Sequence, residues 1–133
     1  MNDMCDIVNK GSGTLYGIGV DIEDIARFKK IFKNTPFLKK VFTDREIAYC
    51  KRYLGKEAHL AARFAGKEAA LKALGIKNGV TLRDIEILNA DDGKPFVNLK
   101  KRNLKTRFIP FISISHSKTK AIAFCVVKKR MER

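Results

Sequence analysis

The chain has 133 residues, about the size of one domain, and 45% of them are hydrophobic, which is enough to build a packed core. Its 28 basic and 14 acidic residues give a formal net charge of +14, which predicts attraction to an acidic partner. No run is long and apolar enough to cross a bilayer, so we expect a soluble protein with no membrane role. Nucleic acid, anionic lipid, a phosphorylated small molecule and an acidic protein all remain open as partners.

The first 14 residues, MNDMCDIVNKGSGT, are polar and lack the apolar stretch of a secretory signal. They predict a flexible polar leader, 1–14, ahead of a single domain, 15–133. The cysteines Cys5, Cys50 and Cys125 are odd in number and form neither a CxxC pair nor a metal-binding spacing with a histidine. Unpaired thiols of this kind fit a reducing cytoplasm.

Residues 15–20, LYGIGV, predict a buried strand that ends at Asp21. Within it, Gly17-Ile18-Gly19 resembles half of a dinucleotide-binding fingerprint, but Ile22 stands where the third glycine belongs, so that interpretation fails. The glycines more simply allow a close backbone contact. A helix is expected from Ile22, and it stops before Asn34-Thr35-Pro36 because proline disfavours continuation.

A second helix is predicted to begin at the capping box Thr43-Asp44-Arg45-Glu46 and to end at Gly55. A third helix is expected over 57–74, with Gly75 beyond its end. This third helix is apolar on two opposite sides. Between the apolar stripes it carries four charges, Arg63 and Lys67 on one flank and Glu68 and Lys72 on the other.

The second half of the chain changes to strand patterns. Residues 85–88 and 96–99 flank a polar turn and predict a β-hairpin, and 112–115 and 121–127 predict two further strands. The order is one strand, three helices and then mostly strands, without βαβ alternation. This order predicts an α+β fold with an antiparallel sheet.

Glu68 carries the strongest chemical signal. An i,i+4 pair with Lys72 is worth only about 0.3 to 0.5 kcal/mol, too little to hold a charge between two buried stripes. A divalent cation would supply the missing partner, with Asp21 as a second oxygen ligand, although Asp21 taken alone is more simply an N-cap. Two carboxylates with phosphate oxygens and waters suit Mg²⁺. Arg63, Lys67 and Lys72 would then balance a phosphate-rich ligand.

Five segments in this order resemble the holo-acyl-carrier-protein synthase family of small, trimeric 4′-phosphopantetheinyl transferases. They are GIGVDI (17–22), FTDREI (42–47), RFAGKEAALKALG (63–75), DGKP (92–95) and SISHS (113–117). The resemblance implies the family's α+β fold, with an N-terminal strand and helices followed by antiparallel strands. It also implies transfer of 4′-phosphopantetheine from coenzyme A to a serine of acidic apo acyl carrier protein, in support of fatty acid biosynthesis, with adenosine 3′,5′-bisphosphate released.

The resemblance further implies a homotrimer with sites between subunits, and it assigns roles to residues of this chain. Asp21 and Glu68 are the expected Mg²⁺ ligands, and Glu68 and Lys72 the expected catalytic residues. The base that accepts the serine proton is either Glu68 or a water on the metal, of which we favour the water. The residues expected to bind coenzyme A are Arg63, Lys67, Lys72, Gly93, Lys94, Pro95, Ser115 and His116. The residues expected to dock the carrier protein are Arg27, Lys30 and Arg45.

The chain departs from the family pattern at one position inside a motif and in one segment between motifs. Gly66 stands where alanine is more usual, which costs up to about 1 kcal/mol of helix stability. Where the family carries a helix before residue 112, this chain has a short basic stretch, 100–111, that contains Pro110. We expect that element to be truncated or irregular.

Two other functions fit parts of the sequence. A basic nucleic-acid-binding module is supported by charge alone, since no RRM, KH, helix-turn-helix or zinc pattern is present. A transferase directed to peptide or polyketide synthase carrier domains is the second, and the short single-domain length favours the acyl-carrier-protein enzyme over it. We therefore expect no nucleic-acid partner.

Overall fold

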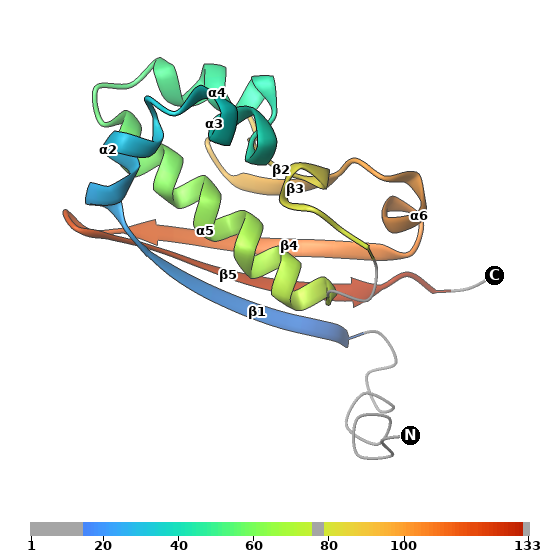
Figure 1. Ribbon diagram of the computed structural model, residues 1–133. Coiled ribbons are helices and arrows are strands. Elements are labelled where there is room, and N and C mark those ends of the chain that lie inside the picture. Colours follow the sequence, from blue (N-terminus) through green and yellow to red (C-terminus); the bar gives the residue numbers. More distant parts are fainter. Residues whose placement is uncertain (1–14, 76–78, 132–133) are drawn as a thin grey trace.

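The computed structural model describes residues 15–75 and 79–131. Its first half consists of β1 (Leu15–Asp24), η1 (Ile25–Arg27), α2 (Phe28–Ile31), α3 (Thr35–Val41), α4 (Asp44–Lys51) and α5 (Lys56–Leu74). Its second half consists of η3 (Leu82–Asp84), β2 (Ile85–Asn89), β3 (Pro95–Leu99), α6 (Arg102–Lys105), β4 (Phe108–His116) and β5 (Lys120–Lys129) (Figure 1). The leader predicted over 1–14 lies outside the described residues.

The strands form two antiparallel sheets, one of order β1-β5-β4 and one made of the β2-β3 hairpin. Helix α5 lies across one face of the three-stranded sheet, and the shorter helices gather beside its first half (Figure 1). The predicted α+β fold with antiparallel strands is confirmed. Within 15–75 and 79–131, none of the helices has the length and apolar content that a membrane crossing requires.

Helix α5 is the centre of the core, as its two apolar stripes predict. Leu60, Ala69, Ala73 and Leu74 are all at most 4% exposed. One stripe packs on β1 and β5 and the other faces the short helices and β2. A helix that is buried on both sides leaves only its flanks for charged side chains, and these flanks build the site described below.

Strand β1 runs further than the sequence predicts. It continues to Asp24, and Asp21 pairs with Ala123 of β5 in the middle of the ladder. The interpretation of Asp21 as an N-cap is therefore wrong, and the helical turn begins only at Ile25. The reason is tertiary, because β5 continues the pairing and the Ile25 amide donates to the Thr119 carbonyl at 2.9 Å.

The two glycines of β1 allow α5 to approach the strand, as predicted. A Cβ at Gly17 would lie 2.1 Å from the carbonyl oxygen of Ala73, and one at Gly19 would lie 2.0 Å from that of Ala69. No side chain fits at these distances. Strand and helix therefore pack backbone to backbone at this end of α5.

Helix α3 is absent from the sequence prediction, which treated Asn34-Thr35-Pro36 only as a stop. Pro36 lies in the first turn of α3, where it needs no amide partner, and the Asn34 side chain accepts a hydrogen bond from the Phe37 amide. The predicted capping box of Thr43 and Glu46 is present at α4. The predicted truncation is also confirmed, since α6 is a single turn and Pro110 lies in the edge strand β4.

The face of the three-stranded sheet away from α5 is apolar and exposed. Register places Ile18, Val126 and Phe111 in one row across the sheet, and Val20 beside Phe124 in the next. Val126 is half-buried, and six other large side chains on this face are at least 43% exposed, namely Ile18, Val20, Ile22, Phe111, Ile122 and Phe124. We call this set the outer apolar face.

Candidate active site

Strand alternation places two carboxylates opposite α5. Gly17 and Gly19 face α5, and a strand turns every second side chain to the same face, so Asp21 and Glu23 face it too. Their side chains are only 11% and 10% exposed. Glu68 of α5 lies close enough for its charge to act on Glu23 and for that of Asp21 to act on Glu68. Asp21 and Glu68 are thus near enough for their charges to interact, their joint binding of a metal ion stays a prediction, and Glu23 is a third acid that the sequence analysis missed.

Lys72 is the cation beside Asp21. Its ammonium donates to the Val20 carbonyl at 2.9 Å and lies 3.2 Å from Asp21 Oδ1. The second oxygen, Asp21 Oδ2, is buried and has no hydrogen-bond partner within the described part of the chain. A buried carboxylate oxygen without a partner is costly, and it fits a cation ligand.

Two of these carboxyl groups, those of Glu23 and Glu68, have raised pKa values. Burial raises the pKa of Glu68, Asp21 raises it further, and Lys72 and Arg27 act in the opposite direction. Burial also raises the pKa of Glu23 to about 7, with the Asp21 carboxyl beside it as the next cause. A divalent cation would relieve this repulsion.

The acids fit a cation bound by few protein ligands. Among residues 15–75 and 79–131, no three His, Cys, Asp or Glu side chains form a ready-made metal-binding group. Asp21 and Glu68 would therefore supply two ligands, and a phosphate ligand and water would supply the rest. This is the mode in which Mg²⁺ usually binds beside phosphates.

Arg27, predicted to dock the carrier protein, lies at the edge of this cluster. Its Nη1 donates to Glu23 Oε1 at 2.7 Å, and its guanidinium lies over the rings of Phe28 and Phe64. The side chain is still 51% exposed. Lys30, on α2, is exposed as well.

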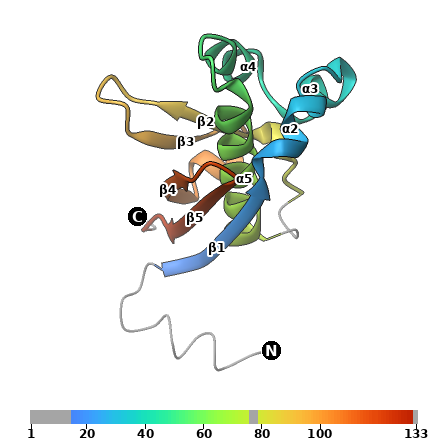
Figure 2. The same ribbon diagram turned by 90° about the vertical axis from the view of Figure 1, so that its left-hand side faces the viewer.

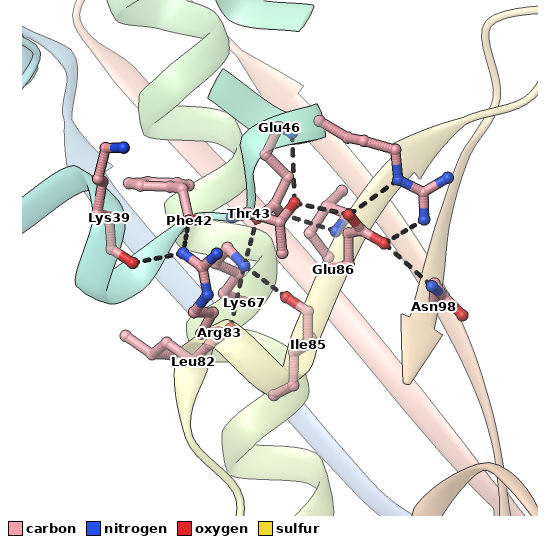
Figure 3. A network of polar contacts seen from close by, with 12 residues as sticks. Lys39, Phe42, Thr43, Glu46, Lys67, Leu82, Arg83, Ile85, Glu86 and Asn98 are labelled. Carbon is pink, nitrogen blue, oxygen red and sulfur yellow. Dashed lines mark hydrogen bonds and ion pairs between the residues drawn. The ribbon is translucent and has the colours of Figure 1, made fainter. Parts of the chain in front are cut away.

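Lys67 does not lie at the surface, where a lysine that binds a phosphate is expected. Its side chain is fully buried, and its ammonium lies 2.6 Å from Glu46 Oε1 and donates to the carbonyls of Leu82 and Ile85 (Figure 3). All of its donors point into the protein. We therefore correct the expectation: Lys67 joins α5 to α4 and the start of β2, and it presents no charge to a coenzyme A phosphate.

Arg45 belongs to the same polar network. It donates to both carboxylate oxygens of Glu86, and Glu86 also accepts from the hydroxyl of Thr43 and the amide of Asn98 (Figure 3). The Arg45 side chain is 65% exposed while that of Glu86 is 1% exposed. The network fastens the β2-β3 hairpin to α4 and leaves one edge of the Arg45 side chain at the surface.

Arg63 lies on the flank of α5 away from β1. It is 4% exposed, its Nη2 donates to Asn89 Oδ1, and its guanidinium lies 3.8 Å from the centre of the Tyr49 ring. Its Nε is buried without a hydrogen-bond partner in the described residues. A cleft of about 420 Å³ opens beside it, lined also by Arg45 and Arg52.

The remaining predicted coenzyme A residues lie on this second side as well. Gly93 has a positive φ of 91° in the hairpin turn, and Lys94 and Pro95 line a hollow of about 390 Å³ between the hairpin and β4. Ser115 and His116 are exposed at the end of β4.

The predicted site residues therefore fall into two groups in one chain. Asp21, Glu68 and Lys72 lie between β1 and α5, whereas Arg63 and the hairpin turn lie beyond α5. The end of β4 lies across β5 from the end of β1. Figure 2 shows β1 and the β2-β3 hairpin on opposite sides of α5. Neither the cleft at Arg63 nor the hollow at Lys94 is lined by Asp21 or Glu68.

Sequence comparisons place the chain among known proteins. The pattern of the 4′-phosphopantetheinyl transferase superfamily matches residues 17–125. The holo-[acyl-carrier-protein] synthase of Thermodesulfovibrio yellowstonii is 48% identical over 115 residues, which cover 85% of this chain and 98% of that protein. The synthase of Clostridium botulinum strain Eklund 17B is 43% identical over 120 residues, with 86% and 98% covered.

Solved structures agree with the sequences. The holo-(acyl-carrier-protein) synthase of Bacillus anthracis, in complex with CoA (3′,5′-ADP), has a TM-score of 0.75 and 35% identity over 88% of this chain and 99% of its own. The synthase of Helicobacter pylori in complex with coenzyme A has a TM-score of 0.72 and 36% identity, with 83% and 98% covered. The family resemblance seen in the five motifs is confirmed. The chain therefore belongs to the 4′-phosphopantetheinyl transferase superfamily and, within it, to the holo-[acyl-carrier-protein] synthases.

Proposed function

We propose that the protein transfers the 4′-phosphopantetheine arm of coenzyme A to a serine of apo acyl carrier protein. The products are holo carrier protein and adenosine 3′,5′-bisphosphate, and the reaction serves fatty acid biosynthesis in the cytoplasm. Its main support is that this chain aligns with relatives named for this activity over nearly the whole length of those relatives. The observation on this chain that carries the proposal is the buried Asp21 Oδ2, which has no hydrogen-bond partner among the described residues and whose carboxyl group acts on Glu68.

Asp21 and Glu68 would hold Mg²⁺, which when bound neutralises charge on the diphosphate of coenzyme A. Lys72, fixed by the Val20 carbonyl and half exposed, can bind a phosphate oxygen of the leaving bisphosphate. The proton of the attacking serine would pass to Glu68 or to a water beside it, and the water is favoured because a carboxylate that binds a cation is a weak base. Phosphoryl transfer needs mainly such positioning and charge balance.

A homotrimer would bring the two groups of site residues together. The first group lies between β1 and α5 and the second lies beyond α5, so one chain does not surround a ligand with both. The outer apolar face, which includes Ile18, Val20 and Phe124, is a group of neighbouring exposed apolar side chains and would become buried between subunits. In this arrangement Asp21 and Glu68 of one subunit would face Lys94 and His116 of a neighbour across bound coenzyme A.

The carrier protein would be attracted by the net charge of +14 and docked by exposed basic side chains. Arg27, Lys30 and Arg45 all have exposed side chains on the helices that precede α5. The alternative of a nucleic-acid-binding module is not supported, since the relatives and solved structures named above are synthases.

A transfer assay tests the proposal directly. The protein is incubated with coenzyme A, Mg²⁺ and apo acyl carrier protein, and we expect mass spectrometry to find one phosphopantetheine arm on the carrier. Glu68→Gln should lower kcat by at least about a hundredfold, because it removes a metal ligand and a proton acceptor together. Glu57→Gln, at the start of the same helix, is the matched control and should leave the rate unchanged. Full activity of Glu68→Gln with Mg²⁺ would refute the metal site.

A further inference from the structure

The positive charge of the chain is concentrated in its last part. From Gly93 to Met131 the sequence contains no acidic residue, so most of the net charge of +14 lies there. Two runs of basic residues, 100–107 and 128–130, are far apart in the sequence, and neither has a part in the proposed reaction. Only the fold decides whether these runs form two surfaces or one.

The structure joins the two runs at one end of the three-stranded sheet. Phe108 of β4 pairs with Lys129 of β5, and one residue further the Arg130 amide donates to the Arg107 carbonyl at 2.8 Å. The Nε of Arg130 donates to the Lys105 carbonyl at 3.0 Å. We call the exposed side chains that gather here the basic end, namely Arg102, Lys105, Arg107, Lys129 and Arg130.

The basic end has no counter-charge of its own. None of its five side chains forms an ion pair within 15–75 and 79–131, whereas Lys101 close by is paired with Asp84 at 3.5 Å. Like charges on one surface repel each other, yet backbone hydrogen bonds hold Arg107 beside Arg130. An anionic partner would relieve this repulsion.

The basic end also has a hollow and exposed apolar side chains. The hollow has a volume of about 240 Å³ and is lined by Thr106, Arg107, Lys129, Arg130 and Met131. Met131 is 82% exposed beside these cations. Leu15 and Tyr16, where β1 begins next to this end of β5, are 37% and 39% exposed. Cations beside exposed apolar side chains are typical of surfaces that contact a bilayer, where the cations meet phosphates and the apolar groups enter the acyl boundary.

A nucleic acid fits this surface less well. Its backbone offers the same phosphates but no apolar layer, so Met131 and Leu15 would stay in water. The sequence analysis expected no membrane role because no segment is long and apolar enough to cross a bilayer. Contact with the surface of a bilayer needs no such segment.

We propose that the basic end is a docking surface for an anionic lipid bilayer, with a lipid phosphate in the hollow and Met131 at the acyl boundary. This docking goes beyond the proposed function and does not depend on it. Asp21 pairs with Ala123 of β5, roughly 20 Å along the strand from Lys129, so the site stays clear of the bilayer. Figure 1 shows α6 and the end of β5 at the opposite end of the sheet from α2, which carries the predicted docking residue Lys30.

Sedimentation of the full-length protein with vesicles tests this docking. Phosphatidylcholine vesicles with about 30 mol% phosphatidylglycerol should bind the protein, less so as salt is raised, and pure phosphatidylcholine vesicles should not. Arg107→Glu/Arg130→Glu should weaken binding at least about thirtyfold, since each cation near an anionic surface contributes about a factor of five. The matched control, Lys39→Glu/Lys40→Glu, makes the same change of charge on exposed side chains of α3 and should weaken binding less than about threefold.

Met131→Ser distinguishes a bilayer from a nucleic acid. It keeps every charge, so we expect about fivefold weaker binding to the anionic vesicles and unchanged binding to single-stranded RNA. The docking surface is refuted if pure phosphatidylcholine binds equally well, if the two charge variants bind vesicles alike, or if Met131→Ser binds vesicles like the wild type. RNA binding without vesicle binding would assign the surface to nucleic acid instead.

A transfer assay without vesicles separates this docking from the proposed function. Circular dichroism should show that all variants are folded, and Arg107→Glu/Arg130→Glu should keep the kcat of the wild type. A wild type that binds anionic vesicles but transfers nothing would end the proposed function and leave the docking surface standing. A wild type that transfers normally but ignores anionic vesicles would do the reverse. Loss of kcat in the folded double variant would contradict a surface separate from the reaction.

Discussion

Lys67 and Lys72 lie five residues apart on α5 and have opposite surroundings. Lys67 is fully buried in an ion pair with Glu46, whereas Lys72 is 53% exposed beside Asp21. The family motif assigned both lysines to the binding of coenzyme A. Only the elements packed against each flank decide which one can reach a ligand.

Replacing the two lysines should therefore separate stability from catalysis. Lys67→Met leaves Glu46 buried and unpaired, and we expect the free energy of unfolding to fall by about 3 to 5 kcal/mol. Lys72→Met removes a pair whose lysine is half exposed and should cost less than about 1 kcal/mol, while lowering kcat/KM for coenzyme A. Urea unfolding and steady-state kinetics measure both. A normal stability for Lys67→Met with a raised KM for coenzyme A would contradict this division.

Glu86 gives the stability a defined dependence on pH. Burial acts to raise the pKa of Glu86, but hydrogen bonds from Arg45, Thr43 and Asn98 outweigh it and lower the pKa to about 2. The unfolded carboxyl titrates near 4.5, so the contribution is complete above that pH and is lost as the pH falls towards 2.

We expect this group to account for at most about 3 kcal/mol of the loss in that window. Glu86→Gln should lower stability at pH 7 and flatten the decline between pH 4.5 and 2, as measured by urea unfolding at a series of pH values. Asp92→Asn, in the exposed hairpin turn, is the control. An equally steep decline in Glu86→Gln would show that other carboxylates are responsible.

At the scale of elements, Gly17 and Gly19 of the strand allow the close approach of α5 to β1. Gly66 of the helix lies on another side of α5, against the side chains of Ile112 and Ile87. A Cβ at Gly19 would lie 2.0 Å from a backbone oxygen, which cannot move without moving the helix. A Cβ at Gly66 would lie 3.0 Å from Ile112 Cδ1 and 3.3 Å from Ile87 Cγ1. Both are side-chain atoms, which can shift by a few tenths of an ångström more readily than backbone can.

The same substitution should therefore have opposite effects at the two glycines. Gly19→Ala should lower the free energy of unfolding by about 3 kcal/mol or more, because strand and helix must separate. Gly66→Ala should raise it by up to about 1 kcal/mol from helix propensity, reduced by the tight contact with Ile112. Thermal and urea unfolding of both variants measure the difference. A stabilised Gly19→Ala protein would mean that α5 does not lie where the structure places it.

At the scale of the whole molecule, the outer apolar face and the division of the site point to the same arrangement. The face covers all three strands, and its central row pairs Val20 with Phe124. In the proposed trimer, the site residues on the two sides of α5 would meet across the boundary between subunits. If the trimer forms through this face, assembly and activity depend on the same side chains.

Phe124→Glu should test that dependence. A charge in the middle of the face should shift the protein from trimer to monomer in analytical ultracentrifugation, since it cannot be buried unpaired. Transfer activity should fall with assembly, although Phe124 lies on the opposite face of the sheet from Asp21 and Glu68. Lys129→Glu, exposed at the end of the same strand and turned to its other face, is the control and should remain assembled. A fully active monomer would refute an intersubunit site.

Local patterns in the sequence determined much of this protein. The capping box of Thr43, the two apolar stripes of α5, the hairpin and the α+β order depend on neighbouring residues, so they could be predicted without a structure. The pairing of Asp21 with Glu68 could also be inferred, because a charge between buried stripes needs a partner. The family motifs supplied the activity.

Tertiary contacts decided the rest. Strand β1 extends past Asp21 because it pairs with β5 there. The extension directs the Glu23 side chain toward α5. Lys67 is buried because α4 and β2 close over its flank of α5, while the flank with Lys72 stays open. Helical spacing places a side chain on a flank, but the free energy of a charge depends on what lies across from it, and only the folded chain determines that.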